Sequence, residues 1–345
     1  MTSGISNGIK ENVSLKPLTT FRIGGKARFF CLINNIEDLK KATNFAKENK
    51  LEIFILGGGS NILVADEGFS GVVIRMNILG TEIKKSADGT QVSVGAGVSW
   101  DEFVGEMVLK NIYGLENLSL IPGSVGAAPI QNIGAYGKEV KDFIDSVEVF
   151  DIKNLKEVKL SNKDCNFSYR DSIFKKEDGK NLVITRVNFL LNGNFNPDIT
   201  YKDLKDYFLG KEPEITPFKL RQAVISIRKG KLPDLKVYGT AGSFFKNPII
   251  DEDLTRSLLG NYPNIPNWRD RDGKTKVSAG FLIDKVCGLG KEQVGDACVW
   301  EKQNLVLINK GEAMAKDVLE LSGKIKKCVK EKTGINLEQE VQFIS

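Results

Sequence analysis

The stretch LIPGSVGAAPIQNIGAYGKEV, residues 120–140, restricts the fold more than any other part of the sequence. It is rich in glycine and small polar side chains and carries hardly any charge, so it would make a poor core and a poor solvated loop. Such a backbone suits close contact with a large, flat, polar-edged ligand, because amides and short side chains supply hydrogen bonds. We therefore expect a fold built around a bound ligand.

A second glycine-rich stretch, GGGSN at 57–61, follows the apolar strand candidate EIFIL at 52–56. Phosphate-binding loops also follow strands, because glycine lets consecutive backbone N–H groups approach an oxyanion. The stretch lacks the Gly-Lys-Ser/Thr ending of a P-loop, and Ile62 stands where the dinucleotide fingerprint needs glycine. Alone, it fits a plain tight turn equally well. Together with residues 120–140, it favours one extended cofactor.

Length and composition limit the class of protein. With 345 residues, 41% of them hydrophobic, the chain can form two or three compact units. Its 49 basic and 44 acidic residues give a net charge of +5 without basic blocks, so nucleic-acid binding is not indicated. A polar N-terminus and the lack of long apolar runs predict a cytoplasmic protein.

The five cysteines have no CxxC or metal-ligand spacing, so we expect free thiols at Cys31, Cys165, Cys287, Cys298 and Cys328. The chain contains no histidine, which excludes Ser-His-Asp and Cys-His catalysis, histidine-ligated zinc and a histidyl-linked flavin. No metal site is expected. Acid–base chemistry must use other side chains or a cofactor. The segment GTAGSFFKNP, 239–248, presents one candidate, Ser243, after a glycine approach.

Hydrophobic spacing predicts mixed α+β structure. Residues 37–50 and 100–111 have helical faces, whereas SVEVFD and NLVITRVNFLL alternate like strands. Charge, glycine and proline at 202–219 predict a connection rather than core. Beyond it we expect helices near 220–227, 278–287 and 312–333, the last ended by Gly334, and a strand pair near 296–308. The tail LEQEVQFI, 337–344, alternates like a strand.

Six segments occur in the order and approximate spacing of the UDP-N-acetylenolpyruvoylglucosamine reductase (MurB) family of flavoenzymes, which the chain resembles over almost its whole length. They are TTFRIGG (19–25), GGGSN (57–61), GLENLSLIPGSVGAAPIQNIGAYGKEV (114–140), YRDSIFK (169–175), GSFFKNP (242–248) and LEQEVQFI (337–344). Within the family, the chain resembles the longer subclass, in which a tyrosine segment closes over the substrate.

The resemblance implies an α+β fold with two FAD-binding subdomains of the vanillyl-alcohol-oxidase-like (PCMH-type) fold and a third α+β domain for substrate. It implies a first subdomain at 14–78 with a return strand at 336–345, a second at 79–218 and a substrate-binding domain at 222–334. Non-covalently bound FAD is expected to contact Arg22, Gly24, Gly57, Gly58, Gly59, Ser60, Asn61, Pro122, Gly123, Ser124, Gly126, Ala127, Gln131, Asn132, Gly134, Ala135 and Tyr136.

The implied reaction reduces UDP-N-acetylglucosamine enolpyruvate to UDP-N-acetylmuramate for peptidoglycan synthesis. NADPH reduces FAD, and flavin N5 then delivers hydride to the enolpyruvyl methylene carbon, which leaves an enolate. Ser243 matches the family's proton donor, and Arg170 and Glu340 match the residues that stabilise the enolate. Substrate binding is implied for Tyr201, Lys231, Asn247 and Gln303. Tyr201 also fits an ordinary aromatic residue at a strand end.

Three positions depart from the family pattern without touching the residues assigned to chemistry. Gln342 replaces an arginine near the substrate diphosphate, Trp300 replaces a histidine, and Lys26 replaces a proline. The expected partners are small molecules alone, with a monomeric chain and no nucleic-acid or membrane partner.

Two other functions are compatible with parts of the sequence. An oxidase of the same flavin superfamily would not need the combination of YRDSIF, GSFFKNP and the terminal Glu-Val, and oxygen should reoxidise its flavin fast. A nucleotide-sugar binding protein without turnover would not take up FAD.

Overall fold

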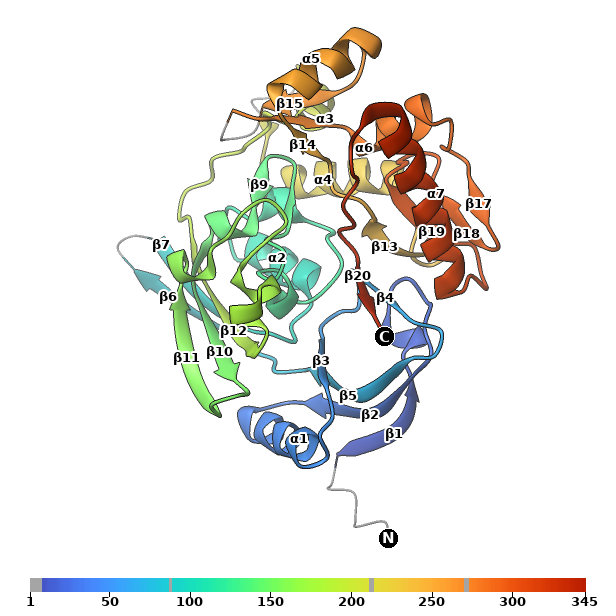
Figure 1. Ribbon diagram of the computed structural model, residues 1–345. Coiled ribbons are helices and arrows are strands. Elements are labelled where there is room, and N and C mark those ends of the chain that lie inside the picture. Colours follow the sequence, from blue (N-terminus) through green and yellow to red (C-terminus); the bar gives the residue numbers. More distant parts are fainter. Residues whose placement is uncertain (1–7, 87–88, 211–213, 270–272) are drawn as a thin grey trace. The chain divides into compact units, whose positions relative to one another are not determined.

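The computed structural model describes residues 8–86, 89–210, 214–269 and 273–345 (Figure 1). The described chain separates into two compact units. The first comprises residues up to Val13, Ala27–Gly58 and Ser70–Gly230, and the second comprises Ser14–Lys26, Gly59–Phe69 and Lys231–Ser345. Both mix helices and strands, as predicted for an α+β chain. The predicted three-part division stays a prediction.

Two sheets form the frame of the first unit. One has the strand order β1-β2-β5-β3, and the other, antiparallel throughout, has the order β11-β10-β12-β7-β6. Their strands are β1 (Ile9–Ser14), β2 (Lys26–Ile33), β3 (Ile53–Leu56), β5 (Phe69–Met76), β6 (Thr81–Ser86), β7 (Gly89–Gly95), β10 (Ile144–Asp151), β11 (Lys156–Ser161) and β12 (Leu182–Leu191). A hairpin of β8 (Gly134–Ala135) and β9 (Lys138–Glu139) adds a third, small sheet.

Two helices of this unit follow the predicted apolar spacing. In α1 (Ile36–Glu48), the side chain of Asn35 accepts a hydrogen bond from the Asp38 N–H at 2.9 Å and so caps the first turn. In α2 (Trp100–Leu109), every apolar residue of the predicted face is buried, namely Trp100, Phe103, Val104, Met107 and Val108. The predicted strands at 52–56, SVEVFD and NLVITRVNFLL are confirmed as β3, β10 and β12.

The prediction that 202–219 is only a connection is wrong. The segment contains α3 (Lys202–Phe208) and the start of α4 (Pro217–Lys231), which continues through the predicted helical face. Leu204 and Phe208 of α3 pack with apolar residues of α4 in a small core of their own. Only these two residues, one turn apart, mark α3 as amphipathic, and the surrounding charges hide the pattern.

The second unit holds an antiparallel sheet of order β13-β19-β18-β17, a small sheet of order β14-β16-β15, and the parallel pair β20-β4. The strands are β4 (Ile62–Val64), β13 (Gly239–Ser243), β14 (Ile249–Ile250), β15 (Asn267–Arg269), β16 (Thr275–Val277), β17 (Gln293–Val294), β18 (Ala297–Val299), β19 (Val306–Asn309) and β20 (Gln342–Ile344). The predicted pair near 296–308 is confirmed as β18 and β19. The tail predicted as a strand over 337–344 is regular only at β20, with one isolated bridge from Gln339 to Phe245.

The helices of the second unit are α5 (Glu252–Asn261), α6 (Ala279–Phe281), which continues into a π-helical turn at Leu282–Val286, and α7 (Ala315–Thr333). Val318, Leu321, Ile325 and Val329 form the buried face of α7. Gly334 ends this helix as predicted, because its φ of 73° lies in the left-handed region that glycine adopts without strain. No helix in the described ranges is long and apolar enough to cross a membrane.

The prediction of five free thiols is wrong. Cys287, directly after the π-helical turn, forms a disulfide with Cys328 of α7. These residues lie 41 positions apart, so sequence spacing gives no sign of the pairing. The remaining three cysteines are free and buried. Burial raises the pKa of Cys31 and of Cys165 to about 12, which keeps both thiols protonated and unreactive at neutral pH.

Candidate active site

The two glycine-rich stretches touch each other in the first unit. A β-carbon on Gly58 would lie 2.6 Å from the Cα of Gly123, and one on Gly57 would lie 2.8 Å from the Oγ of Ser124. Backbone therefore packs directly on backbone, which only glycine permits. The segments that the sequence predicts to serve one ligand thus form one surface.

Hydrogen bonding separates ligand-facing from structural groups in this surface. The N–H groups of Gly126 and Ala127 donate to the carbonyls of Ala96 (2.9 Å) and Ser124 (3.0 Å), so neither amide faces a ligand. In contrast, the hydroxyl of Ser124 is buried and has no partner among the described residues. A buried polar group without a partner is costly, so this hydroxyl fits a ligand that supplies a hydrogen bond.

Asn132 is predicted to contact FAD, but its side chain makes hydrogen bonds within the protein. The residue is fully buried, its Nδ2 donates to Glu139 Oε2 at 3.2 Å and to the Ser168 carbonyl at 3.0 Å, and its Oδ1 accepts from the Lys141 N–H at 3.1 Å. All three side-chain contacts hold the loop together. Asn132 therefore shapes the stretch rather than offering its amide to a ligand.

Arg170 lies against the glycine-rich stretch. Its Nη2 donates to the Gly134 carbonyl at 2.7 Å, its Nη1 donates to the Asn132 carbonyl at 3.4 Å, and its guanidinium lies 5.3 Å from the ring centre of Tyr169. A β-carbon on Gly134 would come within 3.1 Å of Nη1, so glycine makes room for the guanidinium. A planar guanidinium held in place in this way is a side chain suited to binding a carboxylate ligand.

The backbone at several predicted site residues is in the left-handed region. Among the described residues, Arg22, Asn132, Tyr136 and Arg170 have φ values of 55°, 45°, 48° and 55°. Arginine and tyrosine rarely adopt this conformation, which costs roughly 1–3 kcal/mol per residue. It persists only where the surrounding structure enforces it. Tyr136 and Gly137 form the two-residue turn of the β8–β9 hairpin, which requires positive φ at both positions. Such enforced conformations cluster at functional sites.

Tyr201 packs against Tyr136, so a predicted substrate residue meets a predicted cofactor residue. The two ring centres lie 5.2 Å apart in an edge-on arrangement. Tyr201 directly precedes α3, so the alternative of a strand-end aromatic is wrong. Burial raises the pKa of Tyr136 to about 12 and also raises that of Tyr201, so both phenols keep their proton at neutral pH.

Arg228 of α4 is a site candidate that the sequence did not reveal. Its Nε is buried without a hydrogen-bond partner, and its guanidinium makes no ion pair within the described chain. Burial lowers its pKa, whereas the nearby Tyr136 and Asp101 raise it. Asp101 is already held by Arg221 at 2.6 and 3.0 Å. A buried cation without a partner is a binding group for an anionic or carbonyl oxygen.

Glu116, four residues before the stretch 120–140, is a buried acid. Only 3% of its surface is exposed, its Oε2 accepts from the Gly114 N–H at 2.9 Å, and its Oε1 has no partner among the described residues. Burial raises the pKa of its carboxyl group above the usual range of a glutamate. Folding therefore disfavours the charged form of Glu116 relative to the unfolded chain.

Glu116→Gln should stabilise the protein at neutral pH. Because the pKa of Glu116 is higher in the folded than in the unfolded state, protonation of Glu116 adds to the free energy of unfolding at pH values below the unfolded-state pKa. This contribution is lost as the pH rises through the folded-state pKa. At pH 7 the wild type bears the cost of a buried carboxylate, which glutamine removes, so Tm should rise by roughly 1–3 °C. Calorimetry from pH 4 to pH 8 should show this gain disappear at the acid end. The exposed Glu48→Gln is the control, and a gain that does not depend on pH would contradict the assignment.

In the second unit, Ser243 is the last residue of β13 and pairs with Val306 of β19. The next two residues, Phe244 and Phe245, are almost fully buried and pack edge-on with ring centres 5.2 Å apart. They fix the strand end, while the hydroxyl of Ser243 has no hydrogen-bond partner within the described ranges. Lys246, the nearest lysine in the sequence, is paired with Glu338 at 2.9 Å.

Glu340 is hydrogen-bonded to the residue that follows Ser243. Its N–H donates to the Phe244 carbonyl at 2.9 Å, and its own carbonyl accepts from Nδ2 of Asn61 at 3.1 Å. The Gln342 N–H in turn donates to the Asn61 carbonyl at 3.0 Å. The C-terminal tail therefore joins the end of the GGGSN loop to the serine-bearing strand.

The remaining predicted cofactor residues of this unit form close backbone contacts. A β-carbon on Gly24 would lie 2.5 Å from that of Val64, and one on Gly59 would lie 2.2 Å from the Leu18 carbonyl. Arg22 donates through Nη2 to the Leu235 carbonyl. A larger residue at Gly24 or Gly59 would therefore displace Val64 or the backbone of Leu18.

The predicted substrate residues of the second unit are anchored by their neighbours. The Asn247 Oδ1 accepts from the Ala279 N–H at 3.0 Å, which leaves its amide NH2 group as a donor. Gln303 lies in the turn before β19 and donates through its N–H to the Trp300 carbonyl at 3.2 Å. Lys231, the last residue of α4, accepts at its carbonyl from the Trp300 indole at 2.8 Å.

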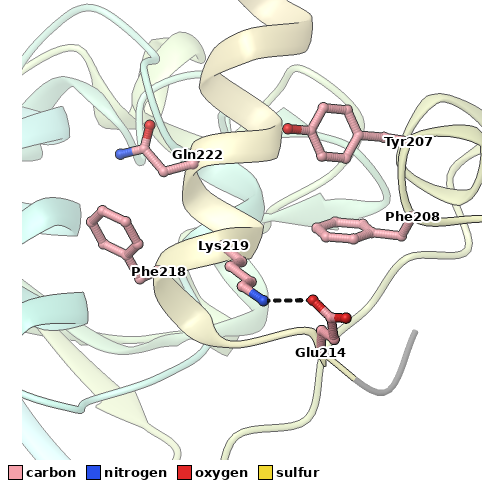
Figure 2. A pocket seen from close by; sticks show the side chains of 6 residues that line it. All are labelled: Tyr207, Phe208, Glu214, Phe218, Lys219 and Gln222. Carbon is pink, nitrogen blue, oxygen red and sulfur yellow. Dashed lines mark hydrogen bonds and ion pairs between the residues drawn. The ribbon is translucent and has the colours of Figure 1, made fainter. Parts of the chain in front are cut away.

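A separate cavity of about 360 Å³ lies between α3 and α4. Figure 2 shows its lining of Tyr207, Phe208, Glu214, Phe218, Lys219 and Gln222. Lys219 is paired with Glu214 at 3.0 Å, so its charge is already neutralised. The cavity contains none of the predicted site residues. Within the described ranges, no group of three or more acidic or cysteine side chains is placed to hold a metal ion.

Comparisons with known proteins agree with the resemblance. Residues 27–160 match the model of an FAD binding domain, and residues 234–344 match that of the UDP-N-acetylenolpyruvoylglucosamine reductase C-terminal domain. The chain is 42% identical over 332 residues to the UDP-N-acetylenolpyruvoylglucosamine reductase of Salmonella typhimurium, covering 96% of this chain and 95% of that one. It is 41% identical over 339 residues to the enzyme of the same name from Neisseria gonorrhoeae, covering 97% of each chain.

A solved structure supports the same relationship. The crystal structure of UDP-N-acetylenolpyruvylglucosamine reductase (MurB) from Thermus caldophilus covers 96% of this chain and 98% of its own, with 29% identity and a TM-score of 0.68. Identity above 40% across nearly the full length of both chains leaves one conclusion. The chain belongs to the UDP-N-acetylenolpyruvoylglucosamine reductase family of FAD-containing oxidoreductases.

Proposed function

We propose that the chain uses NADPH to reduce UDP-N-acetylglucosamine enolpyruvate to UDP-N-acetylmuramate, as a cytoplasmic monomer that supplies peptidoglycan synthesis. Family membership supports the reaction. The hydrogen bond from the Glu340 N–H to the carbonyl of Phe244, the residue after Ser243, supports the assignment of Ser243 and Glu340 to the same site. This backbone link is the observation that carries the proposal.

Arg170, Glu340 and Ser243 have different roles in the proposed reaction. When bound and reduced by NADPH, FAD would supply a hydride to the methylene carbon of the substrate, and negative charge would then spread from the neighbouring substrate carbon into the carboxylate. Arg170 binds that carboxylate with its planar guanidinium, and Glu340 polarises it. Ser243 donates its proton to the adjacent carbon. A strongly basic enolate needs no activated donor, so a serine without a histidine or lysine partner suffices.

Residues of the first unit fit an FAD molecule with polar edges. The hydroxyl of Ser124 and the Nε of Arg228 are buried and find no partner among the described residues, so a ligand oxygen or nitrogen would satisfy them. Gly57 and Gly58 let the two glycine-rich stretches pack together without intervening side chains. We propose that these residues hold the cofactor, with Gly126 and Asn132 shaping the loop from behind.

Gly58→Ala should reduce the flavin content of the purified protein. The added methyl group would meet the Gly123 Cα at 2.6 Å, so one of the two stretches must shift. Gly193→Ala is the matched control, because a β-carbon there meets nothing within 4 Å. We expect the ratio of flavin to protein absorbance to fall by at least half in Gly58→Ala and to stay unchanged in the control. Full flavin content in Gly58→Ala would remove this surface from the cofactor site.

The reaction itself is tested in two half-reactions. The protein is reduced with NADPH without oxygen, UDP-N-acetylglucosamine enolpyruvate is added, and the flavin absorbance is followed. Recovery of the oxidised flavin spectrum is the expected result. A flavin that stays reduced with substrate but reoxidises fast in air would favour an oxidase, and a protein that takes up no FAD would favour a nucleotide-sugar binding protein.

A further inference from the structure

We infer that Trp300 is a positioning residue that sets the relative placement of Lys231 and Gln303 in the second unit. The inference rests on the proposed function, which gives those two residues to the substrate. Trp300 is not itself proposed to touch substrate, cofactor or reacting atoms. It acts through hydrogen bonds to both residues.

The first link joins the indole of Trp300 to Lys231. The Nε1–H donates to the Lys231 carbonyl at 2.8 Å, across a separation of 69 positions in the sequence. Lys231 is the last residue of α4, and the last four carbonyls of a helix have no partner within the helix. Trp300 therefore binds a carbonyl at the end of α4, and it fixes the backbone from which the lysine side chain extends.

The second link joins the backbone of Trp300 to the turn that carries Gln303. The Gln303 N–H donates to the Trp300 carbonyl at 3.2 Å, and the Trp300 N–H donates to the Val306 carbonyl at 2.9 Å. Val306 is also the residue that pairs with Ser243. One residue thus connects the lysine, the glutamine and the strand that ends in the proposed proton donor.

Packing keeps the indole in place. Its ring centre lies 5.4 Å from that of Tyr238, and both rings pack with Leu232 against the buried residues Cys298, Val306 and Ile308. Leu232 directly follows Lys231, so this cluster holds both the residue that donates the indole hydrogen bond and the chain next to the residue that accepts it. A fixed separation between two binding groups lowers the entropy lost when both engage one ligand.

Trp300→Phe isolates the hydrogen bond from the packing, because phenylalanine keeps an aromatic ring against Tyr238 and removes the N–H. We expect the Kd for UDP-N-acetylglucosamine enolpyruvate, measured by calorimetry on the oxidised holoenzyme, to rise roughly three- to tenfold. The rate of flavin reduction by NADPH and the turnover rate at saturating substrate should stay unchanged. A purely structural role would instead lower Tm and impair both half-reactions.

A double-mutant cycle with Lys231→Ala tests whether Trp300 acts through the lysine. The effects of Trp300→Phe and Lys231→Ala on Kd should not add, because removing the lysine side chain also removes what the indole positions. Gln293→Ala is the control: its Nε2 donates to a backbone carbonyl of the same unit, that of Gly295 at 2.7 Å, and its effect should add to that of Lys231→Ala.

The outcomes separate this inference from the proposed function. Wild-type protein that neither binds nor turns over the enolpyruvyl substrate would overturn both. Wild-type protein that turns it over, together with an unchanged Kd in Trp300→Phe or fully additive effects in the cycle, would overturn only the positioning role of Trp300.

Discussion

Ser243→Ala slows the reoxidation of flavin by UDP-N-acetylglucosamine enolpyruvate by at least about 10²-fold, the usual loss when a positioned acid is removed. Reduction of the flavin by NADPH stays nearly intact, because that half-reaction needs no proton from the serine. The fold should survive the change: the hydroxyl has no hydrogen-bond partner within the described ranges, and the buried Phe244 and Phe245 fix the strand end.

Stopped-flow absorbance of the flavin separates the two half-reactions for this variant. Ser257→Ala, an exposed serine on α5 of the same unit, is the matched control and should leave both rates unchanged. If Ser243→Ala slows both half-reactions equally, Ser243 is structural. If neither rate changes, the proton comes from another donor.

Arg170→Met should lower turnover at saturating substrate by about 10²- to 10³-fold, as removal of a charge-stabilising donor does in other enzymes. The lost group is a guanidinium that would bind the substrate carboxylate as negative charge develops. Arg170→Lys should recover only part of the rate, because an ammonium keeps the charge without the planar pair of donors.

The structural role of Arg170 requires a control for the same experiment. Its guanidinium also holds the Gly134 and Asn132 carbonyls, so flavin content and Tm must be measured alongside turnover. Arg186→Met is the matched control, since Arg186 also donates to a backbone carbonyl, that of Ser93 at 3.1 Å, and pairs with Glu82 at 3.2 Å. Loss of flavin in parallel with loss of rate would reassign Arg170 to cofactor binding.

The long elements of the fold could be predicted from the sequence because their apolar residues repeat at the period of a helix or a strand. The buried faces of α1, α2 and α7 show this, and so do β3, β10 and β12. The short helix α3 could not be predicted, since its stability comes from packing of Leu204 and Phe208 on α4 rather than from its own charged sequence. The disulfide of Cys287 likewise depends on a tertiary contact.

At the candidate site, the sequence motifs predict which residues are involved, but they do not predict the contacts that each side chain makes. Asn132 has the residue type of a ligand contact, yet its side chain is fully used in holding the loop. Arg228 was missed because one basic residue in an amphipathic helix is usually solvated. A signal was present: Arg228 lies four positions after the buried Val224, on the same stripe of α4.

The contact between Gly58 and Gly123 has a consequence for inhibitor design. A surface made of main-chain atoms presents the same N–H and C=O groups whatever side chains surround it. A substitution of Gly58 that weakened such a compound would bring a β-carbon to within 2.6–2.9 Å of the opposite backbone. A substitution of Gly123 would strain a backbone with a φ of 128°. Either change would damage the enzyme itself. Compounds that bind the main chain at this point therefore face a target with few routes to resistance.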